Sequence, residues 1–200
     1  MVSKQNRMVS LFIISLSISM LFPESITRGF LRNADISPTD VYENQWALII
    51  GINQYPNFTP LKYAVDDANS MKVTLMTQYG FPEENIELLT DNDATKDKIQ
   101  NAFYNLAEKT RKNDAVVIFF AGHGTTRKNP GSNEDLGYLI PVDGKEENLT
   151  RSTLSMKTIN TFSNEIPAKS VLFLVDACYG GLAAVGQYRS NKDLDIVKGL

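Results

Sequence analysis

The chain has 200 residues, of which 42% are hydrophobic and 22% are charged, as in an ordinary globular domain. The formal net charge of −3 gives no electrostatic reason to expect a nucleic-acid partner. A single cysteine excludes an internal disulfide, and one cysteine with one histidine argues against a zinc site. We therefore expect one domain with an N-terminal appendage.

Residues 1–23 have the pattern of a targeting segment. Lys4 and Arg7 precede a mostly apolar stretch that Pro23 ends, which is typical of a secretory signal peptide. The stretch is short for a membrane-spanning helix, which needs about 20 apolar residues. No clear cleavage site follows, so an uncleaved membrane anchor and a buried hydrophobic helix are the alternatives. We expect a secreted, periplasmic or membrane-anchored protein, with a polar linker at residues 24–44.

From residue 45 onward, strand and helix patterns alternate. The run WALIIGI at residues 46–52 predicts a parallel strand covered on both faces. Apolar spacing predicts one helix over residues 64–79, ended by Gly80, and another from Thr95 through Thr110. The remaining pattern predicts strands at 86–89, 115–120, 138–142 and 171–175, a polar loop at 125–137, and a helix at 155–165. This order indicates an α/β fold with a parallel sheet.

The only histidine and the only cysteine each follow an apolar strand pattern, in VVIFFAGHG and VLFLVDACYG. If both runs are parallel strands of one sheet, His123 and Cys178 emerge at the same edge, where open α/β sheets bind ligands. A free thiol is only about 3% ionised at pH 7, so a nucleophilic cysteine needs a base. We therefore predict a His123–Cys178 catalytic dyad. The alternative is that both residues are structural, since cysteine is commonly buried.

The glycines around His123 support the catalytic interpretation. Gly122 and Gly124 permit a tight turn and close approach of a substrate. The backbone N–H of Gly124, together with that of Cys178, could form an oxyanion hole.

Four motifs occur in a characteristic order: ALIIGIN at residues 47–53, LKYAVDDA at 61–68, FFAGHG at 119–124 and VDACYGG at 175–181. In these motifs the chain resembles the caspase-like cysteine peptidases of the C14 group, and most closely the metacaspases and their bacterial relatives. The resemblance covers about residues 45–185, the large catalytic (p20-like) region. It implies a three-layer α/β/α sandwich with a mostly parallel central sheet. It also implies a cysteine endopeptidase in which Cys178 attacks the scissile carbonyl and His123 protonates the leaving amine.

The resemblance extends to substrate specificity. Metacaspases carry Asp two residues before the nucleophile, here Asp176, and a second Asp at the position of Asp67. Two carboxylates in one S1 pocket would bind the side chain of Arg or Lys. We therefore expect a protein or peptide substrate with a basic residue at P1. The alternatives are a helix-start carboxylate for Asp67 and an ordinary strand-end polar group for Asp176.

The chain also departs from the family pattern. Ala121 and Gly180 stand where metacaspases often carry Ser. Only 22 residues follow Cys178, without a comparable apolar strand. We therefore expect a catalytic domain at residues 45–200 without the p10-like part, either naturally or as a fragment. If the chain is a processing product, basic residues suited to cleavage lie at Arg189, Lys192 and Lys198.

We expect no cofactor, with calcium activation as a weaker hypothesis. Many metacaspases depend on calcium, and Glu134, Asp135 and Asp143 supply suitable oxygen ligands. Their spacing fits no EF-hand, so a solvated acidic loop is the alternative. Two rival functions also stay open: an inactive caspase-like scaffold or regulatory domain, and a legumain- or gingipain-like cysteine peptidase with the same layout.

Overall fold

The computed structural model describes residues 41–128, 135–178, 185–190 and 193–198, with side chains for residues 41–128 and 135–177. The predicted targeting segment and most of the linker lie outside these ranges, so both stay predictions. Within the described ranges, no helix has the length and apolar character needed to cross a membrane.

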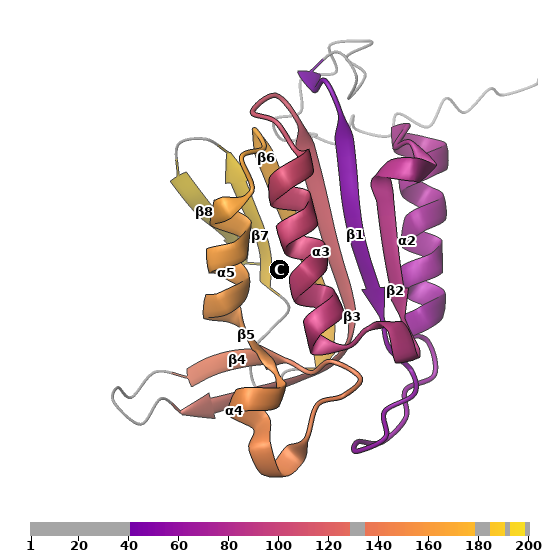
Figure 1. Ribbon diagram of the computed structural model, residues 1–200, viewed down its shortest axis with the longest axis vertical. Helices are drawn as coiled ribbons and strands as arrows, with labels where there is room; N and C mark the ends of the chain where they lie inside the picture. Colours follow the sequence, from indigo (N-terminus) through magenta and orange to yellow (C-terminus); the bar gives the residue numbers. More distant parts are fainter. Residues whose placement is uncertain (1–40, 129–134, 179–184, 191–192, 199–200) are drawn as a thin grey trace, which may run out of the picture. The chain divides into compact units, whose positions relative to one another are not determined.

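A mixed sheet with a parallel centre organises the domain (Figure 1). Its main strands run in the order β2-β1-β3-β6-β7-β8. The first four of these are parallel to one another, whereas β7 and β8 extend the sheet as antiparallel strands. The far part of β3 pairs instead with β4, which pairs with the short β5. The strands are β1 Gln45–Gly51, β2 Ile86–Thr90, β3 Ala115–Lys128, β4 Asp135–Leu139, β5 Leu154–Ser155, β6 Ser170–Cys178, β7 Val185–Ser190 and β8 Asp193–Lys198.

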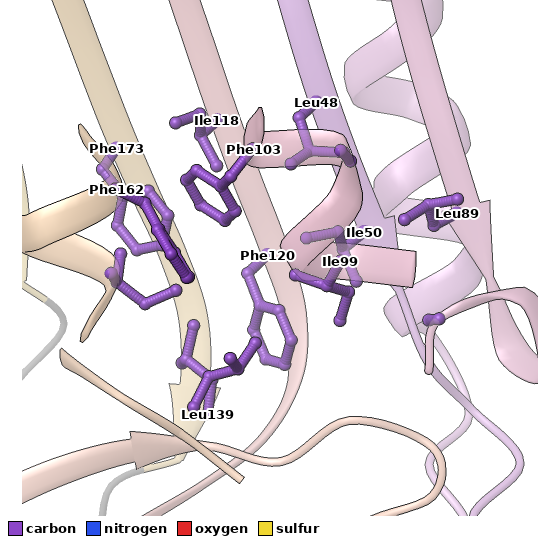
Figure 2. Packing of buried hydrophobic residues seen from close by; sticks show 14 of the residues in the cluster. Leu48, Ile50, Leu89, Ile99, Phe103, Ile118, Phe120, Leu139, Phe162 and Phe173 are labelled. Carbon is purple, nitrogen blue, oxygen red and sulfur yellow. The ribbon is translucent and has the colours of Figure 1, made fainter. Parts of the chain in front are cut away.

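Helices cover both faces of the sheet. Helix α2 (Ala64–Tyr79) packs Ala64, Ala68 and Leu75 into one apolar cluster with the sheet residues Ala47, Ile49 and Phe119. Helices α3 (Lys96–Lys109) and α5 (Met156–Glu165) cover the other face. Figure 2 shows the apolar cluster on that face, where the rings of Phe103 from α3 and Phe162 from α5 lie 5.3 Å apart. The predicted three-layer α/β/α sandwich is thereby confirmed.

The smaller elements connect these layers. Helix α4 spans Leu149–Ser152, and 3₁₀ turns span Glu83–Asn85, Asp91–Asp93 and Glu146–Asn148.

Helix ends follow their local sequence chemistry. Helix α2 has the predicted bounds and ends at Gly80, whose φ of 71° lies in the left-handed region that glycine adopts without strain. Helix α3 begins after Thr95, whose side-chain oxygen accepts a hydrogen bond from the backbone N–H of Lys98. This bond satisfies one of the free N–H groups of the first turn.

Asp114 joins the starting ends of three strands. Its carboxylate is fully buried and accepts hydrogen bonds from the side chain and backbone N–H of Asn44, the indole N–H of Trp46 and the backbone N–H of Arg111. Its carbonyl oxygen accepts the backbone N–H of Lys169, just before β6. Because Asp114 is fully buried and its partners lie at or just before the starts of β1, β3 and β6, it fixes the relative positions of these three strands.

Two sequence predictions about strand length were wrong. The loop predicted at residues 125–137 is largely strand, since β3 continues to Lys128 and β4 begins at Asp135; residues 129–134 lie outside the described ranges. The strand predicted at 138–142 accordingly starts earlier and ends at Leu139. An antiparallel partner can take up the backbone hydrogen bonds of a polar segment and so extend a strand. Such an extension needs no run of apolar residues, unlike the strands at the sheet centre.

The sheet also continues after Cys178. Strands β7 and β8 have the sequences VGQYRS and DLDIVK, which mix polar and apolar residues. These strands are unlike the apolar runs of the sheet centre, as the sequence indicated, and whether the chain lacks the p10-like part stays a prediction.

Candidate active site

The two predicted dyad residues come from neighbouring strands. In the parallel pairing of β3 with β6, His123 lies directly opposite Cys178, the last residue of β6. Adjacent strands are about 4.8 Å apart, so two residues separated by 55 positions in sequence have adjacent backbones. The side chain of Cys178 lies outside the described part of the chain.

The loop between β1 and α2 contacts the imidazole of His123. Nε2 of the ring lies 2.7 Å from the carbonyl oxygen of Thr59. Because a carbonyl oxygen can only accept a hydrogen bond, this contact requires the ring proton on Nε2. In the neutral ring, Nδ1 then carries the basic lone pair.

Aromatic rings from the same loop flank the imidazole. The ring centroid of Tyr55 lies 4.7 Å from that of His123, and the centroid of Phe58 lies 6.1 Å away. These contacts restrict rotation of the imidazole.

The Tyr55 hydroxyl is inserted between two backbone segments. It accepts a hydrogen bond from the backbone N–H of His123 at 3.0 Å and donates one to the carbonyl oxygen of Ile140 at 3.1 Å. The N–H of Ile140 donates to the carbonyl oxygen of His123 at 3.0 Å. Burial raises the pKa of Tyr55 well above its ordinary value, so the hydroxyl keeps the proton that it donates.

Gly122 is needed for this close approach. A Cβ atom at position 122 would lie 2.6 Å from the Tyr55 hydroxyl oxygen. The sequence predicted a tight turn at Gly122 and Gly124, but both lie within the extended strand β3. The prediction of a turn was therefore wrong. Glycine is required at position 122 because the Tyr55 side chain approaches the backbone there.

The backbone of Gly124 faces the β6 side of β3. The carbonyl oxygens of Ala121 and His123 accept hydrogen bonds from Ile52 and Ile140, on the edge of β3 opposite to β6. Backbone polar groups alternate between the two edges along a strand. The N–H of Gly124 is therefore directed toward the side on which Cys178 lies.

A pocket of about 220 Å³ adjoins His123. Both predicted S1 carboxylates, Asp67 from the first turn of α2 and Asp176 from β6, contribute to its lining. Asp66, the neighbour of Asp67, does not. The other lining residues are Leu61, Lys62, Tyr63, Ala64, Ala121 and Gly122. The fold thus brings together two carboxylates and the predicted base from three separate elements.

Sequence reasoning missed the contributions of the β1–α2 loop. Tyr55, Thr59 and Lys62 occur in an irregular segment, where no periodicity marks the direction of a side chain. Thr59 acts through its backbone carbonyl, which its residue type does not reveal.

The residues suggested for calcium are only partly described. Glu134 lies outside the described ranges, and Asp143 accepts a hydrogen bond from the backbone N–H of Lys96 at the start of α3. The described residues contain no group of three or more His, Cys, Asp or Glu side chains able to hold a metal ion. Calcium dependence stays a prediction.

Comparison with known proteins decides the family. A family model described as the caspase domain of the C14 peptidases matches residues 44–196. The chain belongs to this caspase-domain family. Metacaspase-2 of Arabidopsis thaliana is 32% identical, over 72% of this chain and 36% of the relative. Metacaspase-1 of Eremothecium gossypii is 31% identical, over 76% of this chain and 35% of the relative.

A further metacaspase and a solved structure are also similar to this chain. Metacaspase-6 of Arabidopsis thaliana is 29% identical, over 68% of this chain and 38% of the relative, so the chain spans little more than a third of these metacaspases. A solved structure of a Geobacter sulfurreducens protein superposes with a TM-score of 0.57, at 19% identity over 70% of this chain and 52% of that one. This likeness shows the shared fold.

Proposed function

We propose that this caspase-domain chain carries the catalytic centre of a cysteine endopeptidase that cleaves after Arg or Lys. The observation that carries the proposal is the pocket lined by Asp67, Asp176 and His123, at the edge where β3 places His123 opposite Cys178. Membership of the C14 caspase-domain family supports the reaction type.

The proposed reaction begins with proton transfer from the Cys178 thiol to Nδ1 of His123. The thiolate sulfur then bonds to the scissile carbonyl carbon, and the N–H groups of Gly124 and Cys178 stabilise the resulting oxyanion. As the peptide C–N bond breaks, the His123 imidazolium protonates the leaving amine. Water, deprotonated by His123, hydrolyses the thioacyl-enzyme, which releases the acid and regenerates the thiol. The Thr59 carbonyl stabilises the imidazolium through its bond to Nε2.

The acidic pocket supports the specificity. Two carboxylates can pair with a guanidinium in a bidentate manner or with an ammonium as a point charge. Each charged hydrogen bond contributes about 1.5–3 kcal/mol when shielded from water. Asp67 and Asp176 are both exposed in the free chain, so solvent reduces this contribution. We expect a loss of about tenfold in kcat/KM for each carboxylate removed.

A panel of peptides with Arg, Lys, Asp or Asn at P1 tests the proposal. We expect cleavage after Arg and Lys by the wild type and none by Cys178→Ala. Asp67→Asn and Asp176→Asn should raise KM for the basic substrates. Asp66→Asn is the matched control, because Asp66 neighbours Asp67 outside the pocket lining.

The outcomes separate the proposal from its rivals. Cleavage after Asp alone would contradict the acidic S1 pocket, and cleavage after Asn alone would favour a legumain-like enzyme. Absence of any Cys178-dependent cleavage would favour an inactive scaffold.

We further propose a secreted or membrane-anchored location, supported by the basic and apolar pattern of residues 1–23. Expression of the full chain with N-terminal sequencing of the product tests it. Loss of residues 1–23 indicates a cleaved signal peptide, and an intact N-terminus in the membrane fraction indicates an anchor. An intact N-terminus in the cytoplasmic fraction would contradict the proposal.

A further inference from the structure

His123 is contacted from several directions by one short segment, residues 52–63 between β1 and α2. The Tyr55 hydroxyl binds the backbone N–H of His123, and the Tyr55 ring lies against its imidazole. The Thr59 carbonyl binds Nε2 of the same ring. Backbone and side chain of the predicted base are therefore both held by this segment, which we call the histidine loop.

The histidine loop is itself fixed at its start. One carboxylate oxygen of Asp91 accepts the backbone N–H groups of Asn53 at 2.7 Å and Gln54 at 2.9 Å. Asp91 adopts a φ of 42°, the only positive value among the described residues other than glycine. A non-glycine residue in this region is strained and persists where the surrounding contacts determine it. These two hydrogen bonds supply such contacts.

The rest of the loop is tied by further hydrogen bonds. The N–H of Leu61 donates to the carbonyl oxygen of Asn53 at 2.8 Å, which closes the loop on itself. The side-chain amide of Asn57 donates to the carbonyl oxygen of Gly144, also at 2.8 Å. The loop therefore has a defined backbone course between Tyr55 and Thr59.

We propose that Tyr55 is the positioning residue of His123: its hydroxyl fixes the backbone of His123, and its ring holds the imidazole with Nε2 on the Thr59 carbonyl. Tyr55 does not line the pocket that contains Asp67 and Asp176. Its hydroxyl lies between His123 and Ile140, at the point where β3 leaves β1 and begins to pair with β4. The effect of Tyr55 on catalysis rests on the proposed function, whereas its positioning of the His123 imidazole does not.

Removing the hydroxyl separates its role from that of the ring. In Tyr55→Phe the ring remains, but the N–H of His123 and the carbonyl of Ile140 lose their shared partner in a buried position. The backbone at His123 is then free to shift, and Nε2 is no longer held on Thr59. We expect kcat for a P1-Arg peptide to fall about tenfold or more, since small misplacements of a catalytic base are costly. KM should change less than twofold, because Asp67 and Asp176 are untouched.

The single histidine permits a test that does not depend on activity. In protein with 15N-labelled histidine, long-range proton–nitrogen correlation spectra contain the signals of one imidazole only. We expect the neutral wild-type ring to carry its proton on Nε2 alone. Tyr55→Phe should show a mixture of the two tautomers.

Two further variants make the test decisive. Tyr104→Phe is the matched control, because Tyr104 is exposed on α3 and its ring packs against Phe162; its spectrum and kcat should equal those of the wild type. Asp91→Ala frees the start of the histidine loop while Tyr55 remains, and it replaces Tyr55→Phe if that variant does not fold. It should also give a tautomer mixture.

A wild-type tautomer and wild-type kcat in folded Tyr55→Phe would overturn the proposal. Should the wild-type chain cleave no peptide, the proposed peptidase function fails, and the histidine spectra still decide the role of Tyr55. An Nε2-only ring in both Tyr55→Phe and Asp91→Ala would show that the histidine loop does not position it.

Discussion

The contact between β1 and α2 at Gly51 gives a prediction with a calculable size. A Cβ atom at this position would lie 2.5 Å from the carbonyl oxygen of Ala64, 2.6 Å from Cβ of Ala68 and 3.1 Å from Cα of Val65. Carbon atoms pack best at about 3.5–4.0 Å. Gly51→Ala therefore requires α2 to move away from the sheet by about 1 Å.

The expected cost follows from this displacement. Overpacking a core costs about 1–3 kcal/mol, and the upper half applies because two of the three contacted atoms belong to the backbone of α2. Replacing glycine also lowers the conformational entropy of the unfolded chain, which offsets about 0.4–1 kcal/mol of this cost. The net loss is about 1–2.5 kcal/mol, which for a chain of this size lowers Tm by about 2–10 °C.

Thermal unfolding followed by far-UV circular dichroism measures this loss. Ser70→Ala is the control, because Ser70 is exposed on the same helix and alanine has the higher helix propensity, so its Tm should not fall. Movement of α2 also carries Asp67 away from Asp176, so KM for a P1-Arg peptide should rise in Gly51→Ala. A Tm equal to or above that of the wild type would refute the close packing of α2 on β1.

Three further changes have defined outcomes. Asp114→Ala removes the acceptor of four hydrogen bonds in a fully buried position and should cost about 3–5 kcal/mol in urea unfolding; a loss below about 1 kcal/mol would contradict its role at the strand starts. Thr95→Ala removes the cap of α3 and should cost about 1 kcal/mol in the same assay, whereas an unchanged unfolding midpoint would contradict the cap. Burial raises the pKa of Tyr55 in the folded chain, so only the unfolded chain loses this phenol proton as pH rises above about 10. The free energy of unfolding should therefore fall more steeply above that pH in the wild type than in Tyr55→Phe, and equal slopes in the two proteins would contradict this.

The sequence predicted those parts of the fold whose signals are local. The bounds of α2 follow from its apolar spacing and from Gly80 at its end, and the starts of β1, β3 and β6 follow from runs of apolar residues buried on both faces. The extension of β3 beyond Gly124 and the strands after Cys178 could not be predicted in this way. Their residues are held by pairing with a neighbouring strand, and such pairing leaves no apolar run in the sequence.

In the candidate site, too, the residues with local sequence signals were predicted and those held by distant contacts were not. His123, Asp67 and Asp176 were marked by motifs, and the structure places all three at one pocket. Tyr55 and Thr59 were not marked, because the loop that carries them is fixed by distant groups such as Asp91 and Gly144. Gly122 was recognised as a special position for the wrong reason, since the approach of Tyr55 requires it and no turn occurs there.

Covalent labelling of Cys178 tests the proposed catalytic centre most directly. Because the chain contains one cysteine, the mass of label that a peptidyl chloromethyl ketone adds to the wild type and not to Cys178→Ala reports that residue alone. We expect a P1-Arg reagent to label the wild type much faster than the matching P1-Asp reagent. Asp176→Asn should remove this preference, and His123→Ala should slow labelling by both reagents. Equal labelling rates for the two reagents in the wild type, unchanged by Asp176→Asn and by His123→Ala, would contradict a His123–Cys178 centre with an acidic S1 pocket.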